Sequence, residues 1–473
     1  MTLQAIKKRL LDLAIHGSLV PQIESEGTAD DILQAIAKEQ KTKTSFSEIP
    51  ESEKPFSIPS SWRWVRLGDV CELITKGSSP SWQGVKYVDE GILFITSENV
   101  GNEELLLSKS KYLEPKFNEI QSRSILKKGD ILTNIVGASI GRTAIFDLDI
   151  GNANINQAVA IIRLVNLDLS SYIVKVLNSQ MIIAQMTDNT VNTARANISL
   201  TTVKNLLIPL PPLSEQTRIV TKLETMLTEI DEIEQGRKNI EALKDKLRNK
   251  ALQLAIEGKL VEQRAEEGDA RALLDEIKAE KAQLIAEKKI KKDKPLAPID
   301  DSEIPFDIPD SWVWVRLGEV CDKMISTKPT GEYFKYIDID AIDNKICKIR
   351  EPKKTLTQNA PSRATRHTQK GDVLFSMVRP YLKNIALVEE DGCIASTGFY
   401  VCRPFDGLSS LFLFELMTSE YVVNGLNKFM KGDNSPSINN VDIENLPIPL
   451  PPLGEQKRIV EELDEVMAEI DKL

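Results

Sequence analysis

The chain has 473 residues, a formal net charge of −10, 41% hydrophobic residues and 27% charged residues. This composition is that of a folded protein too long for one small domain, and no apolar run approaches the length of a membrane span. The sequence opens as an amphipathic helix and not as a signal peptide, and its five scattered cysteines form no C-x-x-C pair. These features predict a multi-domain cytoplasmic protein with reduced thiols and no membrane partner.

The first expected element is a helix that ends in the motif L-A-I-x-G-x-L-V at residues 13–20, and the same motif returns at residues 254–261. Each copy is followed by a short capped helix and then by a polar linker, at residues 41–54 and 288–302. A repeat of this length is typical of a duplicated domain and not of a solenoid.

Two globular regions come next, and both open with I-P-x-S-W-x-W-V-R-L-G-[DE]-V-C, at residues 58 and 308. Strand-like runs broken by Gly, Asn and Asp turns predict mixed α/β structure over about 150 residues in each region. A K-G-D-[IV]-L motif aligns at residues 128 and 370, but the residues 137–142 and 379–384 that follow are unlike. A shared frame with unlike loops suggests one task performed on two different targets.

A long helix follows the first globular region, after the motif P-L-P-P-L-x-E-Q-x-R-I-V at residues 209–220. We expect Ser214 to cap its start and Gly258 to end it. Some 40 residues would form a rod roughly 60 Å long. Its apolar residues recur at helical spacing, so the rod needs a partner helix: Ile219, Leu223, Met226, Ile230, Ile233, Ile240, Leu243, Leu247 and Leu254.

The second copy of this motif, at residues 449–460, begins a helix that reaches only Leu473. The N-terminal helix carries the missing end of the repeat, so the two terminal helices together match the central rod. We therefore predict an α+β protein with two mixed α/β domains, two long antiparallel coiled-coil helices and a pseudo-twofold circular organisation in which the termini meet. The predicted segments are 1–45, 55–210, 211–300, 305–450 and 451–473.

Catalytic motifs are absent from the sequence. The two histidines, His16 and His367, cannot form an H-E-x-x-H site, and neither a P-loop nor G-x-G-x-x-G occurs. No Asn-Pro-Pro-aromatic tetrad offers the stacking pocket of an amino-methylating enzyme. The sequence therefore favours a binding protein that holds no cofactor or metal of its own.

Charge is unevenly distributed along the chain. A net negative charge argues against a polyanionic partner, but the acidic excess lies mainly in the helical segments. Basic residues cluster at 109–128 in the first globular region and at 345–370 in the second. Such clusters can neutralise phosphates, although an ordinary solvated basic face is the alternative interpretation.

Polar loops in both regions carry side chains that match the donors and acceptors of base edges. Each single residue could equally belong to an ordinary turn. The candidates in the first region are Lys76, Ser78, Ser79, Arg142, Asn154, Asn156 and Gln157. The candidates in the second region are Lys348, Lys353, Arg363, Arg366, Arg379, Tyr381, Lys383, Ser396, Thr397, Lys431, Asn434 and Ser435.

With its two variable regions, each followed by P-L-P-P-L-x-E-Q-x-R-I-V and a long helix, the chain resembles the specificity subunit of type I restriction–modification systems. The resemblance covers essentially the whole chain. It implies two target-recognition domains, each of which reads half of a split, asymmetric site in double-stranded DNA. It also implies two methyltransferase subunits that use S-adenosylmethionine, and restriction subunits with ATP-dependent translocation, around a non-catalytic specificity subunit.

On this interpretation the paired rods act as a spacer that sets the distance between the half-sites. Two other classes of function stay open. One is a protein–protein scaffold whose duplicated domains bind protein or peptide, and the other is a DNA-modifying enzyme with an unrecognised active site. An assembly from half-length subunits is disfavoured by the internal duplication.

Overall fold

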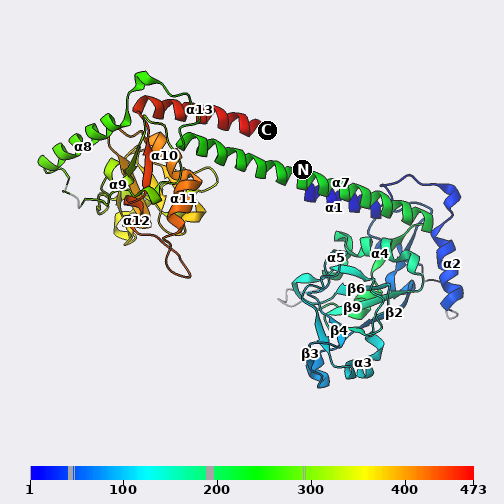
Figure 1. Cartoon of the computed structure of the whole chain (residues 1–473). Coiled ribbons are helices and arrows are strands. Elements are labelled where there is room, and N and C mark those ends of the chain that lie inside the picture. The colour runs from blue at the N-terminus through cyan, green and yellow to red at the C-terminus, as the bar shows by residue number, and fades with distance from the viewer. Residues whose placement is uncertain (1, 41–45, 47, 188–196, 291, 293–294) are drawn as a thin grey trace. The chain divides into compact units, whose positions relative to one another are not determined.

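The computed structural model describes residues 2–40, 46, 48–187, 197–290, 292 and 295–473 (Figure 1). The chain forms two compact units, residues 1–236 and 237–473. Each unit combines a globular domain with helical pieces that lie far apart in the sequence. Among the described residues, no helix is both long enough and apolar enough to cross a membrane.

The helical part of the first unit consists of α1 (Leu3–Ile15), α2 (Ala29–Gln40) and the first part of α7 (Leu213–Ile256). Helices α1 and α7 run antiparallel, since Lys7 pairs with Asp231 whereas the chain after α1 reaches Arg218, which binds Glu26. Leu10, Ala14 and Ile15 share a buried core with Ile219, Leu223 and Ile230. Helix α4 (Ser170–Leu177) is the part of the first domain that faces this helix pair (Figure 1).

The described residues of the first domain form two four-stranded sheets and a two-stranded ribbon that closes the domain. The ribbon pairs β1 (Arg63–Arg66) with β10 (Leu207–Leu210). The antiparallel sheet has the order β2 (Cys71–Lys76), β9 (Val159–Leu164), β6 (Asp130–Asn134) and β7 (Thr143–Phe146). The mixed sheet has the order β3 (Tyr87–Val88), β5 (Lys111–Leu113), β4 (Ile92–Ile95) and β8 (Ala153–Ile155). The helices are α3 (Lys116–Ile120), α4 (Ser170–Leu177), α5 (Gln180–Thr187) and α6 (Leu200–Lys204).

The second domain repeats the ribbon and the antiparallel sheet, whereas its mixed sheet has the parallel pair at the centre and not at one edge. Its ribbon pairs β11 (Val313–Arg316) with β22 (Pro447–Leu450). The antiparallel sheet has the order β12 (Cys321–Asp322), β21 (Phe399–Pro404), β18 (Val373–Ser376) and β19 (Ile385–Leu387). The mixed sheet has the order β16 (Lys353–Leu356), β13 (Tyr333–Ile337), β20 (Cys393–Ser396) and β17 (Ala364–His367). A small hairpin, β14 (Ile342–Asp343) and β15 (Lys348–Ile349), is added to this frame. The domain's helices are α9 (Leu317–Val320), α10 (Ser410–Thr418), α11 (Glu420–Asn427) and α12 (Asn440–Glu444).

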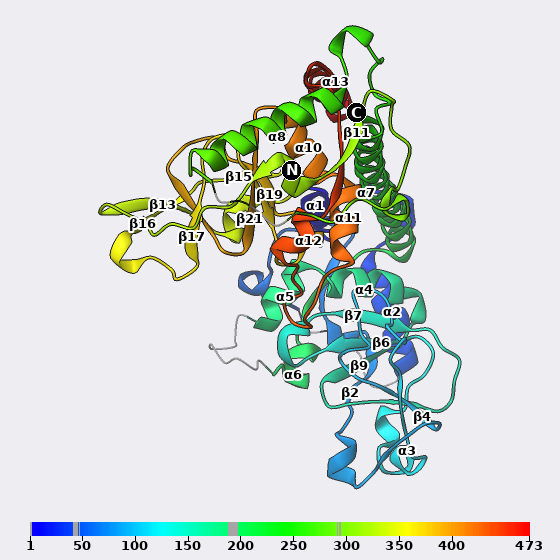
Figure 2. The same ribbon diagram turned by 60° about the vertical axis from the view of Figure 1, so that its left-hand side comes forward.

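The helices of the second unit are the later part of α7, α8 (Ala270–Ala286) and α13 (Leu453–Lys472). Helix α13 runs antiparallel to α7, because Asp471 pairs with Arg248 whereas Glu455, at its other end, binds Gln263 beyond α7. Helix α8 crosses one end of the domain (Figure 2), where the Lys281 ammonium lies 5.9 Å from the ring centroid of Phe405.

The repeated K-G-D motif has a structural role in both domains. Asp130 accepts two hydrogen bonds of 2.7 Å from the guanidinium of Arg163 on β9. Asp372 binds Arg403 on β21 in the same way, at 2.9 and 2.7 Å. Both aspartates are buried, so a removed arginine would leave a buried charge unpaired.

These observations confirm the predicted α+β class, with two mixed α/β domains and a long central helix. The helix ends at Ile256, two residues before Gly258, whose φ of 68° is the left-handed geometry of a helix stop. The expected cap at Ser214 is wrong, because α7 already begins at Leu213 and Ser214 is exposed within its first turn. The circular closure of the chain stays a prediction.

Candidate nucleic-acid interface

The repeated motifs meet at one joint in the first unit. The indole N–H of Trp62 donates to Glu215 Oε2 at 3.0 Å, and Gln22 donates to the other carboxylate oxygen at 2.7 Å. Gly17 has a φ of 69°, and a Cβ at this position would clash with the ring of Pro59. The joint therefore attaches the domain to both helices.

The second unit contains an equivalent joint. Trp312 donates to Glu455 at 2.9 Å, and Gln263 donates to the same carboxylate at 2.5 Å. Gly258 packs against Pro309 as Gly17 does against Pro59. Burial raises the pKa of Glu455 and of Glu215, although the Trp and Gln donors oppose this shift. The most similar parts of the two halves are thus structural joints.

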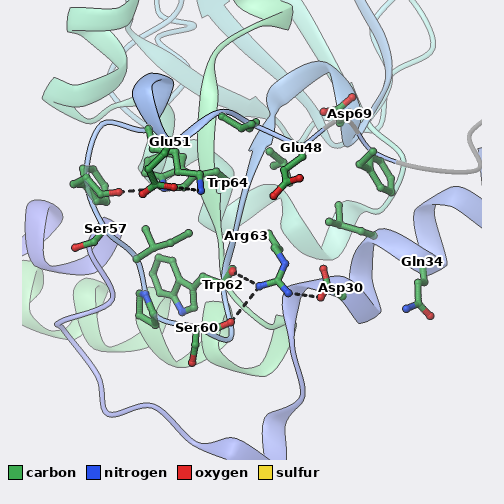
Figure 3. Close-up of a pocket in the computed structure, with 18 of the residues that line it drawn as sticks. Asp30, Gln34, Glu48, Glu51, Ser57, Ser60, Trp62, Arg63, Trp64 and Asp69 are labelled. Atoms are coloured by element: carbon green, nitrogen blue, oxygen red, sulfur yellow. Dashed lines mark hydrogen bonds and ion pairs between the residues drawn. The ribbon is translucent and has the colours of Figure 1, made fainter.

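A cavity of about 720 Å³ lies beside the first joint, between α2, β1 and the segment before β1 (Figure 3). Arg63 spans it and donates to Asp30 at 2.6 Å and to the carbonyl of Ser60 at 3.2 Å. Among the described residues, four carboxylates and two cationic side chains line this cavity, and this balance disfavours a phosphate: Asp30, Glu48, Glu51, Asp69, Lys54 and Arg63. None of the predicted DNA contacts lines it.

The loops predicted to contact DNA are held by the same backbone frame in both domains. In the first domain, Ile135 N–H donates to Ala158 at 2.9 Å and Ile198 N–H donates to Ile135 at 2.8 Å. In the second domain, Met377 donates to Gly398 at 2.8 Å and Ile438 donates to Met377 at 3.0 Å. The loops at 137–142 and 379–384 therefore occupy equivalent places, as the sequence alignment predicts.

The first domain brings two groups of predicted residues together. Lys76 is exposed at the end of β2, and the next residue, Gly77, leaves no room for a Cβ beside the carbonyl of Ile155. This contact places Ser78 and Ser79 next to the β8–β9 loop with Asn156 and Gln157. Arg142 is exposed on the neighbouring β6–β7 loop.

Asn154 does not belong to this surface. Its side chain is fully buried, and its amide donates to Asn118 Oδ1 at 2.8 Å and to the Gln121 carbonyl at 3.1 Å. Its own oxygen accepts the N–H of Ile155 at 2.8 Å. All of these bonds are internal, so the structure gives Asn154 a structural role in place of the predicted exposed one.

In the second domain, the η12 turn (Pro380–Leu382) carries Tyr381 between Arg379 and Lys383. The guanidinium of Arg379 donates to the Asn434 carbonyl at 2.7 Å, which places the predicted residues Lys431, Asn434 and Ser435 beside this turn. Arg379 and Lys383 have φ values of 49° and 52°, uncommon for residues other than glycine. Such strain is characteristic of functional loops.

The remaining predicted residues lie near the mixed sheet. Arg363 accepts, through its carbonyl, the N–H of Thr397 at 2.8 Å, and Lys348 is exposed on β15. Lys353 is paired with Asp340 at 2.7 Å, which neutralises part of the basic stretch. Burial lowers the pKa of the half-buried Arg366. Ser396 is fully buried, so it is not the exposed contact that its loop composition predicts.

Two exposed aromatic residues were missed by the sequence interpretation. Trp82 lies in the η4 turn (Pro80–Gln83), next to Ser78 and Ser79, and is 73% exposed. Phe429 is 48% exposed and precedes Lys431. The sequence feature that could have identified them is an aromatic residue within a loop that contains Ser, Gly and Pro. Among the described residues, no group of three His, Cys, Asp or Glu side chains could hold a metal ion.

Two domains with the same frame and unlike polar loops, each attached to an antiparallel helix pair, define a class of paired recognition proteins. The chain belongs to the family described as "Type I restriction modification DNA specificity domain", which matches residues 59–242 and 309–472. It is therefore a DNA-recognising specificity subunit of the type I restriction–modification class.

Individual relatives agree with this assignment. The type I restriction enzyme EcoAI specificity subunit of Escherichia coli is 24% identical, over 100% of this chain and 90% of that protein. The EcoBI specificity subunit of the same organism is 32% identical over 48% of this chain and 49% of its own length.

Solved structures share the fold. The HsdS subunit from Thermoanaerobacter tengcongensis has a TM-score of 0.50 at 23% identity, over 89% of this chain and 93% of that one. A chain from a study of complex assembly and conformational transition of the type I R-M system has a TM-score of 0.59 at 22% identity, over 88% of this chain and 93% of its own.

Proposed function

We propose that the chain reads a bipartite, asymmetric target in double-stranded DNA, one half with each domain, and recruits methyltransferase and restriction subunits to it. The observation that carries this proposal is the equivalence of the loops at 137–142 and 379–384, which share one frame and differ in chemistry. Two domains with different recognition loops on one chain are what two different half-sites would require.

The charges of these loops support a nucleic-acid partner. Within the described part of the chain, Lys76, Arg142, Lys383 and Lys431 form no ion pair, so their charges are available to phosphates. Polar side chains of the same loops can contact base edges. Because each half-site is short, firm binding needs both domains at once, and the second contact is then nearly intramolecular.

Helix α7 offers a surface for the other subunits. In the second unit Ile240, Leu243 and Leu247 are exposed at helical spacing on it. Such an apolar stripe suits a partner helix. On this proposal the chain catalyses nothing and acts in the cytoplasm with two methyltransferase subunits, which bind S-adenosylmethionine. Restriction subunits with ATP-dependent translocation join the same assembly.

Mapping methylated adenines genome-wide, after co-expression of the chain with its methyltransferase subunit, tests the proposal. A bipartite motif with a fixed gap is the expected result, and exchange of residues 62–210 for another domain should change only one half. Contiguous methylation, or none with an active partner, would contradict it. The absence of salt-dependent binding to duplex DNA would favour the protein–protein scaffold.

A further inference from the structure

A polar hollow of about 460 Å³ opens in the second domain, beside the η12 turn. Asp338, Arg363 and Asn384 line it together with Asp340, Asn344 and Leu382. Asn344 donates to the carbonyl of Leu382 at 2.9 Å, which ties the hollow to the turn that carries Tyr381. The hollow is therefore continuous with the loops that the proposed function assigns to DNA.

Most charges at the hollow already have partners. Asp340 is paired with Lys353 at 2.7 Å, and Arg350 is paired with Asp343 at 3.2 Å. Asp338 Oδ1 accepts the backbone N–H of Ile339 at 2.9 Å, and its Oδ2 lies 3.8 Å from the Arg363 guanidinium, within ion-pair distance but beyond hydrogen-bond distance. Among the described residues, the guanidinium of Arg363 makes no hydrogen bond. This pair therefore keeps donors and an acceptor for a ligand.

A second observation also indicates a ligand here. Asn384 is 8% exposed and lines the hollow, yet its side-chain amide makes no hydrogen bond to any residue that the structure describes. An amide that opens onto the hollow in this way offers a donor and an acceptor to a ligand.

We propose that Arg363 and Asp338 together read one G·C base pair in the half-site of the second domain, with Asn384 facing the same base-pair edge. Guanine presents the acceptors N7 and O6 in the major groove, and cytosine presents an amino group. O6 and that amino group are hydrogen-bonded to each other and lie about 3 Å apart. A guanidinium and a carboxylate separated by 3.8 Å match this arrangement of acceptors and donor. The inference rests on the proposed function.

The lining of the hollow carries two carboxylates and two guanidiniums, so it offers no net positive charge to a phosphate: Asp338, Asp340, Arg350 and Arg363. The first domain differs at the same place. The last parallel pairs of the mixed sheets are Ile95–Ile155 and Ile337–Ala395, so Thr96 stands where the second domain has Asp338. The hydroxyl of Thr96 is bound to Asn99 at 3.0 Å. This reader of G·C therefore belongs to one half-site only.

The test compares methylation motifs of the complete complex with wild-type chain, Arg363→Gln, Asp338→Asn and Lys335→Gln. Lys335 on β13 is the matched control, because it lies outside the hollow and is paired with Glu390. We expect R363Q and D338N to relax the same single G·C position of one half-site, and K335Q to leave the motif unchanged. Variants that fold and keep every position, or that relax different halves, would overturn the inference.

If the variants lose methylation altogether, the inference is tested by measuring how the wild-type complex binds modified duplexes. Replacement of one guanine by 7-deazaguanine removes N7, and we expect roughly tenfold weaker binding or more at a single position of that half-site. No sensitive guanine there would overturn the inference. If the wild-type complex methylates no bipartite motif, the proposed function is contradicted, and this inference is contradicted with it.

Discussion

At the scale of single residues, the joints depend on two buried glutamates. Glu215 accepts from Trp62 and Gln22, and Glu455 accepts from Trp312 and Gln263. Each carboxylate accepts one hydrogen bond from a tryptophan at the start of a domain and one from a glutamine in the turn after another helix. A single side chain therefore holds a domain, a helix and the turn after another helix together.

Substitution Glu215→Ala leaves the buried indole N–H of Trp62 and the amide of Gln22 without an acceptor. We expect a loss of about 1–3 kcal/mol in the free energy of unfolding, the usual effect of an unsatisfied buried donor. Glu229→Ala, at an exposed position of the same helix, is the control. Equal stability of the two variants in urea unfolding would show that the joint is not needed.

A second residue-scale prediction concerns Glu415 on α10. Burial, together with the nearby Asp464, raises the pKa of its carboxyl from 4.5 to about 7. The folded state therefore holds this proton more tightly than the unfolded chain does. Its contribution to stability is complete below about pH 4.5 and is lost as the pH rises through about 7.

Substitution Glu415→Gln removes the ionisable carboxyl, so the variant should not lose stability as the pH rises through about 7. Thermal unfolding should show a variant more stable than wild type at pH 8, by at most roughly 3 kcal/mol, and little difference at pH 4. Glu461→Gln, at an exposed position of α13, is matched for the change in charge. A stability difference between wild type and E415Q that does not depend on pH would contradict the prediction.

At the scale of elements, two glycines of the central helix region have opposite roles. Gly258 ends the helix at a φ of 68° and packs against Pro309, whereas a Cβ at Gly236 would meet nothing within 4 Å. Backbone conformation and packing therefore favour alanine at Gly236 and disfavour it at Gly258.

Gly258→Ala should destabilise the second unit by more than about 1 kcal/mol, because it combines left-handed strain with a clash. Gly236→Ala should instead stabilise α7 by up to about 1 kcal/mol, the difference in helix propensity. Urea unfolding of both variants measures this, and a Gly258→Ala variant as stable as wild type would contradict the prediction.

At the scale of the whole molecule, α7 connects the two units as one helix of 44 residues. If it spaces the two readers, its length sets the gap in the DNA target. Four residues inserted near Gln235 add about 6 Å of helix, and we expect the gap of the methylated motif to change. The same insertion in the linker at 288–302 should leave the gap unchanged. A constant gap in both variants would exclude α7 as the spacer.

The sequence by itself determined the duplication, the two α/β domains, the central helix and the equivalence of the variable loops. These properties are local, since a helical stripe, a glycine stop or a repeated motif depends on neighbours in the chain. Only the tertiary structure decided which polar residues are exposed. Asn154 and Ser396 have the composition of loop readers, yet packing buries both.

Tertiary structure also decided which groups meet. The bond from Trp62 to Glu215 joins residues 153 positions apart, and no periodicity encodes it. In the same way, packing pairs Lys353 with Asp340 at 2.7 Å but leaves Arg363 and Asp338 3.8 Å apart. The physical reason is that burial and partner choice depend on the three-dimensional arrangement of distant segments, whereas residue type and spacing encode only the local elements.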